Sequence, residues 1–274
     1  MAQMPEQTTP TVVDSIDSLQ FLIRELINQV EPKTLYIDLE GINLSRHGTV
    51  SFLTLLVNYG GVHPDHLYLI DIHTLGSAAF NTSSTTLALN NQSKTLKDIL
   101  ESPTQTKVIF DVRNDSDALF SNFGIRLQGV MDLQLMENAA RKGNVRGKKM
   151  VHGLAKCIKE DSNLSEDQKI KWELAKEEGR RLFAPELGGC YEVFNERPLK
   201  KEIKAYCEQD VWFLPHLYKV YRDRLGIGYS EGPNWYKAIS SETAKRLEES
   251  RSETYEPQGR DKALAPVWET SQYV

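Results

Sequence analysis

The sequence predicts an α/β protein, a mixed sheet of about five or six strands flanked by helices. Short apolar runs bounded by turn residues gather in the first half of the chain, before Asp132. Apolar residues at helical spacing then dominate from Asp132 to Leu225. The predicted order is strands first, then strands alternating with helices, and then helices alone. This order is typical of a sheet covered by helices.

The first half supplies most of the predicted sheet. Residues 1–13 are expected to form a flexible lead-in, and the apolar spacing from Ser15 to Val30 predicts an amphipathic helix. Three apolar runs follow, separated by Gly and Pro turn signals, and they predict a three-stranded meander. These runs are Thr34–Glu40, Val50–Tyr59 and Leu67–Asp71.

The next segments alternate between short strands and short helices. The polar stretch 76–93 is expected to be a surface loop. Further strands are predicted at 107–110 and 129–131, and short helices at 95–100 and 116–122. Residues 14–225 then form one predicted domain, whose last helices include one starting near Leu199. Residues 226–274 are expected to be a C-terminal extension with a helix at 240–250 and a disordered end.

Composition sets broad limits on location and partners. The net charge of −5 does not indicate a nucleic-acid-binding protein, although a locally basic face remains compatible with it. Three cysteines without a CxxC pair favour a reducing compartment over a disulfide framework. The sequence shows no signal peptide and no apolar run of about 20 residues. An intracellular protein, cytoplasmic or nuclear, with no membrane association is therefore expected.

Two acids on one strand form the first candidate motif. Asp38 and Glu40 lie two positions apart in the predicted strand Thr34–Glu40, so both side chains leave the same face. Carboxylates placed together on an apolar strand repel each other unless a cation neutralises them. Taken alone, however, the pair is equally consistent with two solvated acids at the end of a strand.

Two further motifs can each be explained by a purely structural role when taken alone. Asp115 follows an apolar strand at a predicted helix start, where an acid also suits the helix dipole, while Asp111 and Asp117 are neighbouring decoys. Tyr206 and Asp210 lie four positions apart on a late helix, so they share one face. A core tyrosine and a surface aspartate would give the same spacing.

Taken in order, these motifs resemble the DEDDy family of 3′–5′ exonucleases, which includes RNase D. Asp38-x-Glu40, Asp115 and Tyr206-x-x-x-Asp210 carry the resemblance, which covers roughly residues 14–225. Ala205 stands where the other subclass has a histidine. Segments such as Leu182–Pro185 are similar to the branch containing Egalitarian and related exonuclease-domain proteins. The resemblance implies an RNase H-like sheet and hydrolysis from the 3′ end of single-stranded RNA or DNA, with RNA favoured.

The resemblance also implies a catalytic role for Asp38, Glu40, Asp115, Tyr206 and Asp210, with two Mg²⁺ or Mn²⁺ ions as cofactors. Asp38 would bridge the ions, Glu40 and Asp210 would complete the site on the nucleophile side, and Asp115 would hold the second ion. Tyr206 would orient the attacking water, because a phenol with a pKa of about 10 is a poor base at neutral pH.

Basic residues are the candidates for contacts with the substrate backbone. A run that leads into a helix offers the best set, although a solvated structural face is an equal alternative. It comprises Arg141, Lys142, Arg146, Lys148, Lys149, His152 and Lys156.

The second hypothesis is a non-catalytic RNA-binding or scaffold protein that retains the exonuclease fold. Its protein partner would bind the C-terminal extension, whose aromatic residues are numerous for a tail. They are Tyr229, Trp235, Tyr236, Tyr255 and Trp268.

Overall fold

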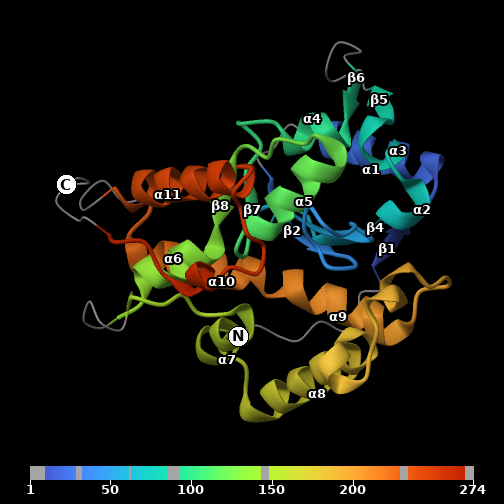
Figure 1. Ribbon diagram of the computed structural model, residues 1–274. Coiled ribbons are helices and arrows are strands. Elements are labelled where there is room, and N and C mark those ends of the chain that lie inside the picture. The colour runs from blue at the N-terminus through green and yellow to red at the C-terminus, as the bar shows by residue number, and fades with distance from the viewer. Residues whose placement is uncertain are drawn as a thin grey trace.

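A computed structural model describes residues 10–28, 33–61, 63–85, 93–142, 148–228 and 234–268. Its central feature is a six-stranded mixed sheet (Figure 1), which confirms the predicted fold class. In spatial order the strands are β1 (Thr11–Val13), β4 (His66–Asp71), β3 (Phe52–Asn58), β2 (Thr34–Glu40), β7 (Lys107–Ile109) and β8 (Val130–Asp132).

The predicted meander is confirmed, since β2, β3 and β4 are antiparallel neighbours. Strand β1 runs parallel to β4, so residues 11–13, expected to be part of the flexible lead-in, extend the sheet instead. The β-branched sequence Thr-Val-Val suits such an edge strand. Strands β7 and β8 continue the sheet in parallel beyond β2.

One face of the sheet is covered by three helices. Leu35 and Ile37 of β2 point to this side and share a core cluster with residues of all three. These helices are α1 (Ile16–Asn28), α4 (Leu96–Leu100) and α5 (Arg113–Phe123). Between α1 and α4 lie several short elements: α2 (Ile72–Leu75), α3 (Ala78–Asn81), β5 (Ser83–Thr85) and β6 (Ser93–Thr95). The last three fall within or at the edge of the expected surface loop 76–93, of which residues 86–92 lie outside the described residues. The predicted loop at 76–93 therefore holds more regular structure than its composition suggested.

The opposite face carries the later helices. Tyr36 of β2 points to this side and joins a second core cluster, and a third cluster joins β3 to α9. The helices are α6 (Leu133–Ala140), α7 (Leu154–Asp161), α8 (Glu166–Phe183), α9 (Lys201–Trp212) and α10 (Leu214–Leu225). In Figure 1, α8 lies at the lower right, outside α9. None of the helices in the described parts of the chain has the length and apolar character needed to cross a bilayer.

The C-terminal extension contacts the domain through helix α11 (Trp235–Ser250), which packs against α5 and β8. The ring of Trp235, the first residue of α11, packs against the ring of Trp268, with centroids 5.7 Å apart. The Trp268 indole also donates a hydrogen bond to Asn138. Of the other aromatic residues nominated for a partner surface, Tyr236 is exposed, and Tyr229 lies outside the described residues. Much of this aromatic surface is thus used within the chain.

Candidate active site

Strand β2 presents Asp38 and Glu40 on the face of the sheet that helix α9 covers. Their neighbours Ile37 and Leu39 are buried in the opposite core. Alternation along a strand separates the two sets, so the apolar residues anchor the strand while the acids emerge together. The sequence predicted this placement correctly.

Helix α9 brings the third motif to the same place. Its residues Ile203 and Cys207 are fully buried against Phe52 of the neighbouring strand β3. That packing turns Asp210 toward β2, where one carboxylate oxygen from each of Asp38, Glu40 and Asp210 lies within 4.8 Å of the others. We call these three residues the acidic cluster.

Asp115 lies beside the acidic cluster in the first turn of α5. Its side chain is buried, and burial followed by the charge of Asp38 raises the pKa of its carboxyl group well above the usual range. An electrostatic influence of this kind requires proximity, because the interaction between charges falls with distance. The structure therefore brings the four predicted acids into one neighbourhood.

Asp111 and Asp117, the two acids near Asp115 that were not predicted to be catalytic, pair with arginines instead. Asp111 accepts two hydrogen bonds from Arg113, at 2.6 and 2.8 Å. Asp117 accepts from the backbone and the guanidinium group of Arg46, both at 2.7 Å. Asp111 also has a left-handed φ of 59°, a conformation that aspartate tolerates better than most residues, at the turn from β7 into α5.

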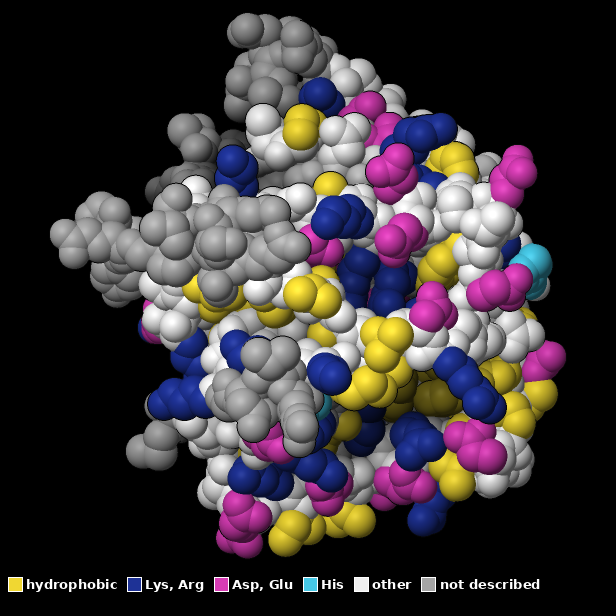
Figure 2. Space-filling view, turned by 60° about the vertical axis from the view of Figure 1, so that its left-hand side comes forward, with side chains coloured by type: hydrophobic (Ala, Val, Ile, Leu, Met, Phe, Trp, Pro, Cys, Tyr) yellow, Lys and Arg dark blue, Asp and Glu magenta, His cyan; other side chains and the backbone are white. Residues whose placement is uncertain are grey.

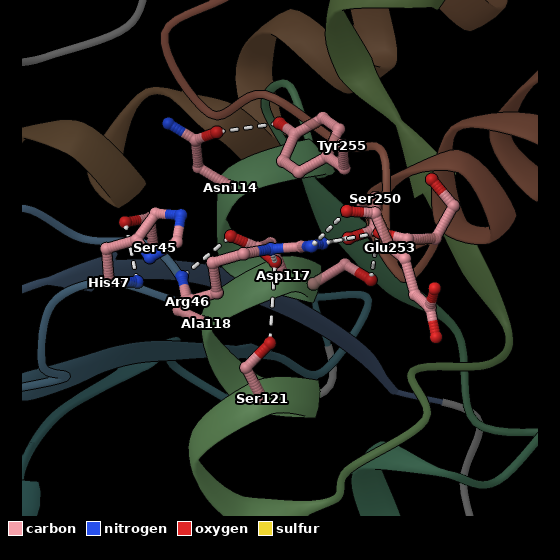
Figure 3. Close-up of polar contacts among 12 residues, drawn as sticks. Ser45, Arg46, His47, Asn114, Asp117, Ala118, Ser121, Ser250, Glu253 and Tyr255 are labelled. Atoms are coloured by element: carbon pink, nitrogen blue, oxygen red, sulfur yellow. Dashed lines mark hydrogen bonds and ion pairs between the residues drawn. The ribbon is translucent and has the colours of Figure 1, made fainter.

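Arg46 fastens the start of α5 to the C-terminal extension (Figure 3). Besides Asp117, its guanidinium group donates to the backbone carbonyls of Ser250, Ser252 and Glu253. Tyr255 donates a hydrogen bond of 2.7 Å to Asn114, the residue immediately before Asp115. The extension thus holds the turn that carries the second acidic motif.

The acidic cluster is electrostatically unfavourable without a cation. Burial and the charge of Asp210 raise the pKa of Asp38 to about 8, and burial with Asp38 and Asp210 raises the pKa of Glu40. Hard divalent cations prefer such carboxylate oxygens and would remove this repulsion. The donor set therefore fits a divalent metal ion.

Two residues of helix α8 complete the surroundings of the site, and sequence reasoning missed both. The Lys176 ammonium group contacts the Asp210 carboxylate and lies 4.0 Å from the centroid of the Tyr206 ring. Gly179, one turn later, faces the same ring. A Cβ atom at position 179 would lie 2.7 Å from the Tyr206 Cβ and 3.0 Å from its Cδ2. Neither residue belongs to a recognisable motif.

Gly179→Ala is expected to displace Tyr206 and to lower turnover by about 10–100-fold, because small misplacements at a reacting centre are costly. Helix propensity works in the opposite direction, since alanine favours a helix by about 1 kcal/mol over glycine. Comparing initial rates with thermal unfolding separates the two effects. Unchanged turnover in the variant would show that the Tyr206 position is not constrained by α8.

The predicted nucleic-acid-binding residues fall into two groups. Arg141 and His152 pair with Glu137, and the Lys148 ammonium group donates to the Ala139 carbonyl. The exposed group comprises Lys142, Lys149 and Lys156, and Arg146 lies outside the described residues. The exposed lysines are thus the better placed to reach a solvent-borne ligand.

Comparison with known proteins agrees with this geometry. The family model described as 3′–5′ exonuclease matches residues 10–225. The chain therefore belongs to the 3′–5′ exonuclease family, and the predicted DEDDy-type, RNase D-like membership is confirmed.

Two curated relatives match 132 residues, or 48% of this chain. They are the piRNA biogenesis protein EXD1 of Mus musculus, 33% identical, and that of Homo sapiens, 31% identical. The matches span only 20% and 22% of the lengths of these relatives. The likeness therefore concerns one part of each relative.

Solved structures share the fold at low sequence identity. RNase D from Trypanosoma brucei, in its complex with GMP, has a TM-score of 0.66 at 18% identity, covering 93% of this chain and 68% of that chain. RNase D from Escherichia coli has a TM-score of 0.59 at 20% identity, covering 89% of this chain and 51% of that chain. These neighbours show that the chain has the RNase D fold.

Proposed function

We propose that this chain is a metal-dependent 3′–5′ exonuclease that hydrolyses phosphodiester bonds at the 3′ end of single-stranded nucleic acid. The observation that carries the proposal is the acidic cluster, in which carboxylate oxygens of Asp38, Glu40 and Asp210 lie within 4.8 Å of one another. Buried Asp115 beside them supplies the fourth acid of the family pattern. A charge concentration of this kind is unfavourable in a protein that binds no cation.

The acids divide naturally between two Mg²⁺ or Mn²⁺ ions. Asp38, Glu40 and Asp210 would hold one ion, and Asp115 together with Asp38 would hold the other. Ions bound there would supply an activated water molecule and charge stabilisation for the leaving oxygen. The acids would be held in place for this role, because β2, α5 and α9 are each anchored in the core.

Tyr206 orients the attacking water in this scheme. Burial, followed by the charges of Asp210, Glu40 and Asp38, raises the pKa of its phenol. The hydroxyl group therefore stays protonated at neutral pH and acts through hydrogen bonds rather than as a base. Helix α8, packed against its ring through Gly179, restricts where that hydroxyl group can point.

RNA is the favoured substrate. The Trypanosoma brucei RNase D, a neighbour with a TM-score of 0.66, has been solved in complex with RNA U12. The exposed lysines Lys142, Lys149 and Lys156 would contact the phosphate backbone. Figure 2 shows Lys and Arg side chains around a hollow in the right-hand half of the face, where hydrophobic side chains are also gathered. Such a mixture suits a strand that presents both phosphates and bases.

Digestion of 5′-labelled single-stranded RNA with Mg²⁺ or Mn²⁺ tests the proposal. Wild-type protein is expected to give a ladder that shortens from the 3′ end. Asp38→Asn, which removes one charge from the acidic cluster, is expected to lower the rate by about 10³-fold. Asp167→Asn, an exposed acid of helix α8, serves as the matched control and should cut normally.

A different result would redirect the assignment. Retention of RNA without cleavage, under either metal, would contradict the exonuclease and support the non-catalytic RNA-binding alternative. Equal cleavage by wild type and Asp38→Asn would place the activity outside the acidic cluster.

A further inference from the structure

Lys176 brings a positive charge to the acidic cluster, although it belongs to none of the three sequence motifs that form the site. Its ammonium group contacts Oδ1 of Asp210, and the two side chains are only 16% and 8% exposed. Burial and neighbouring acids raise the pKa values of Asp38 and Glu40, and the charge of Lys176 opposes that rise. The ammonium group therefore acts on three of the four acids at once.

Helix α8 holds Lys176 at this point. Gly179 allows the helix to approach Tyr206 so closely that no Cβ atom would fit without movement. The Lys176 ammonium group then lies above the Tyr206 ring, at 4.0 Å, where a cation is attracted to the aromatic face. The Asp210 carboxylate and the Tyr206 ring thus bind the Lys176 ammonium group together.

A metal ion held by Asp38, Glu40 and Asp210 would bind the same carboxylate that this ammonium group contacts. A divalent ion and an ammonium group on one carboxylate would repel each other. Metal binding therefore weakens the contact between Lys176 and Asp210. Lys176 has an alternative place, because its side chain also lines a surface groove of about 650 Å³ with Lys159 and Arg180.

We propose that Lys176 is a built-in counter-ion that occupies the acidic cluster in the metal-free protein and competes with the metal ion for Asp210. Metal loading displaces the ammonium group from Asp210 toward the groove that Lys176 already lines. This inference rests on the proposed metal-dependent function. It assigns Lys176 a positioning role, acting through Asp210 on the affinity for metal.

Isothermal titration calorimetry of Mn²⁺ binding to the full chain tests this competition directly. Lys176→Met is expected to bind Mn²⁺ about tenfold more tightly than wild type, because the competing charge is gone. The metal-free variant should melt at a lower temperature, and Mn²⁺ should raise that temperature further than in wild type. Lys176→Arg keeps the charge and should resemble wild type. Lys171→Met, an exposed lysine of the same helix, is the matched control.

The outcomes separate this inference from the function on which it rests. If wild type and Lys176→Met bind Mn²⁺ equally well, the inference is overturned and the metal-dependent function stands. If wild type, Lys176→Met and Lys176→Gln all fail to bind Mn²⁺, both are overturned. Lys176→Gln gives the same comparison should the methionine variant not fold, because it also removes the charge. Weaker Mn²⁺ binding in either neutral variant would show that Lys176 supports the metal site instead.

Discussion

Glu40→Gln is expected to abolish exonuclease activity and to raise the melting temperature of the metal-free protein. Glu40 is surrounded by acids, and burial followed by Asp38 and Asp210 raises its pKa well above the usual range. A neutral amide of the same shape removes the repulsion together with one metal ligand. The direction of the pKa shift therefore predicts a gain in unfolding free energy for the variant.

The pH dependence follows from the direction of these shifts. A carboxyl group whose pKa is higher in the folded state than in the unfolded state destabilises the fold as it ionises. The destabilisation is absent below the unfolded pKa of about 4.3 for glutamate, and it grows until the pH exceeds the folded pKa. With Asp38 at about 8, the metal-free wild type should lose stability from pH 5 to pH 8.

Differential scanning fluorimetry across this pH range, with and without Mg²⁺, checks the result. Without metal, Glu40→Gln should lose less stability than wild type as the pH rises. Mg²⁺ should stabilise wild type more than it stabilises Glu40→Gln. Glu178→Gln, an exposed position on helix α8, controls for the substitution itself. Identical pH profiles for wild type and Glu40→Gln would contradict the electrostatic account of the acidic cluster.

Arg246→Met is expected to give the largest loss of stability among single substitutions in the C-terminal extension. Arg246 lies in α11 and donates a hydrogen bond of 2.6 Å to Asp132, whose side chain is fully buried. Removing one partner of a buried ion pair leaves an uncompensated charge, which costs about 3–5 kcal/mol. For a domain of this size that corresponds to a fall of about 10 °C in melting temperature.

Thermal unfolding in the metal-free state measures the effect. Lys245→Met, at the exposed neighbouring position of the same helix, is the control and should change the melting temperature by no more than about 1–2 °C. The double variant Arg246→Met with Asp132→Asn should recover part of the loss, because no buried charge is left. If Arg246→Met melts at the same temperature as wild type, Arg246 is not needed to stabilise the Asp132 carboxylate. The backbone N–H groups that donate to Asp132 would then be sufficient.

Local patterns in the sequence were sufficient for the sheet and the acids. The strand Thr34–Glu40 was predicted with its final bounds, because alternation and the Gly41 turn signal both lie within a few residues. Short spacings placed Asp38 with Glu40, and Tyr206 with Asp210, on shared faces. Only the order of the three motifs along the chain, which resembles the DEDDy family, marked these residues as one site.

Long-range packing decided what the sequence could not predict. Lys176 reaches Asp210 across 34 positions, and Arg246 reaches Asp132 across 114. A lysine or arginine on an amphipathic helix has no local mark that separates such a role from a solvated one. The fixed place of the extension on α5 was missed for the same reason.

The bonds of Arg46 also have a consequence for the order in which the protein assembles during synthesis. Its carbonyl partners at Ser250 and Ser252 follow it by 204 and 206 positions. Ribosomes add about 5–20 residues per second, so about 10–40 seconds separate the synthesis of Arg46 from that of these partners. Asp117, the partner of Arg46 in α5, follows it by only 71 positions, so the chain contains this pair well before it contains α11. The turn that carries Asp115 is therefore secured late, only after residue 250 has left the ribosome.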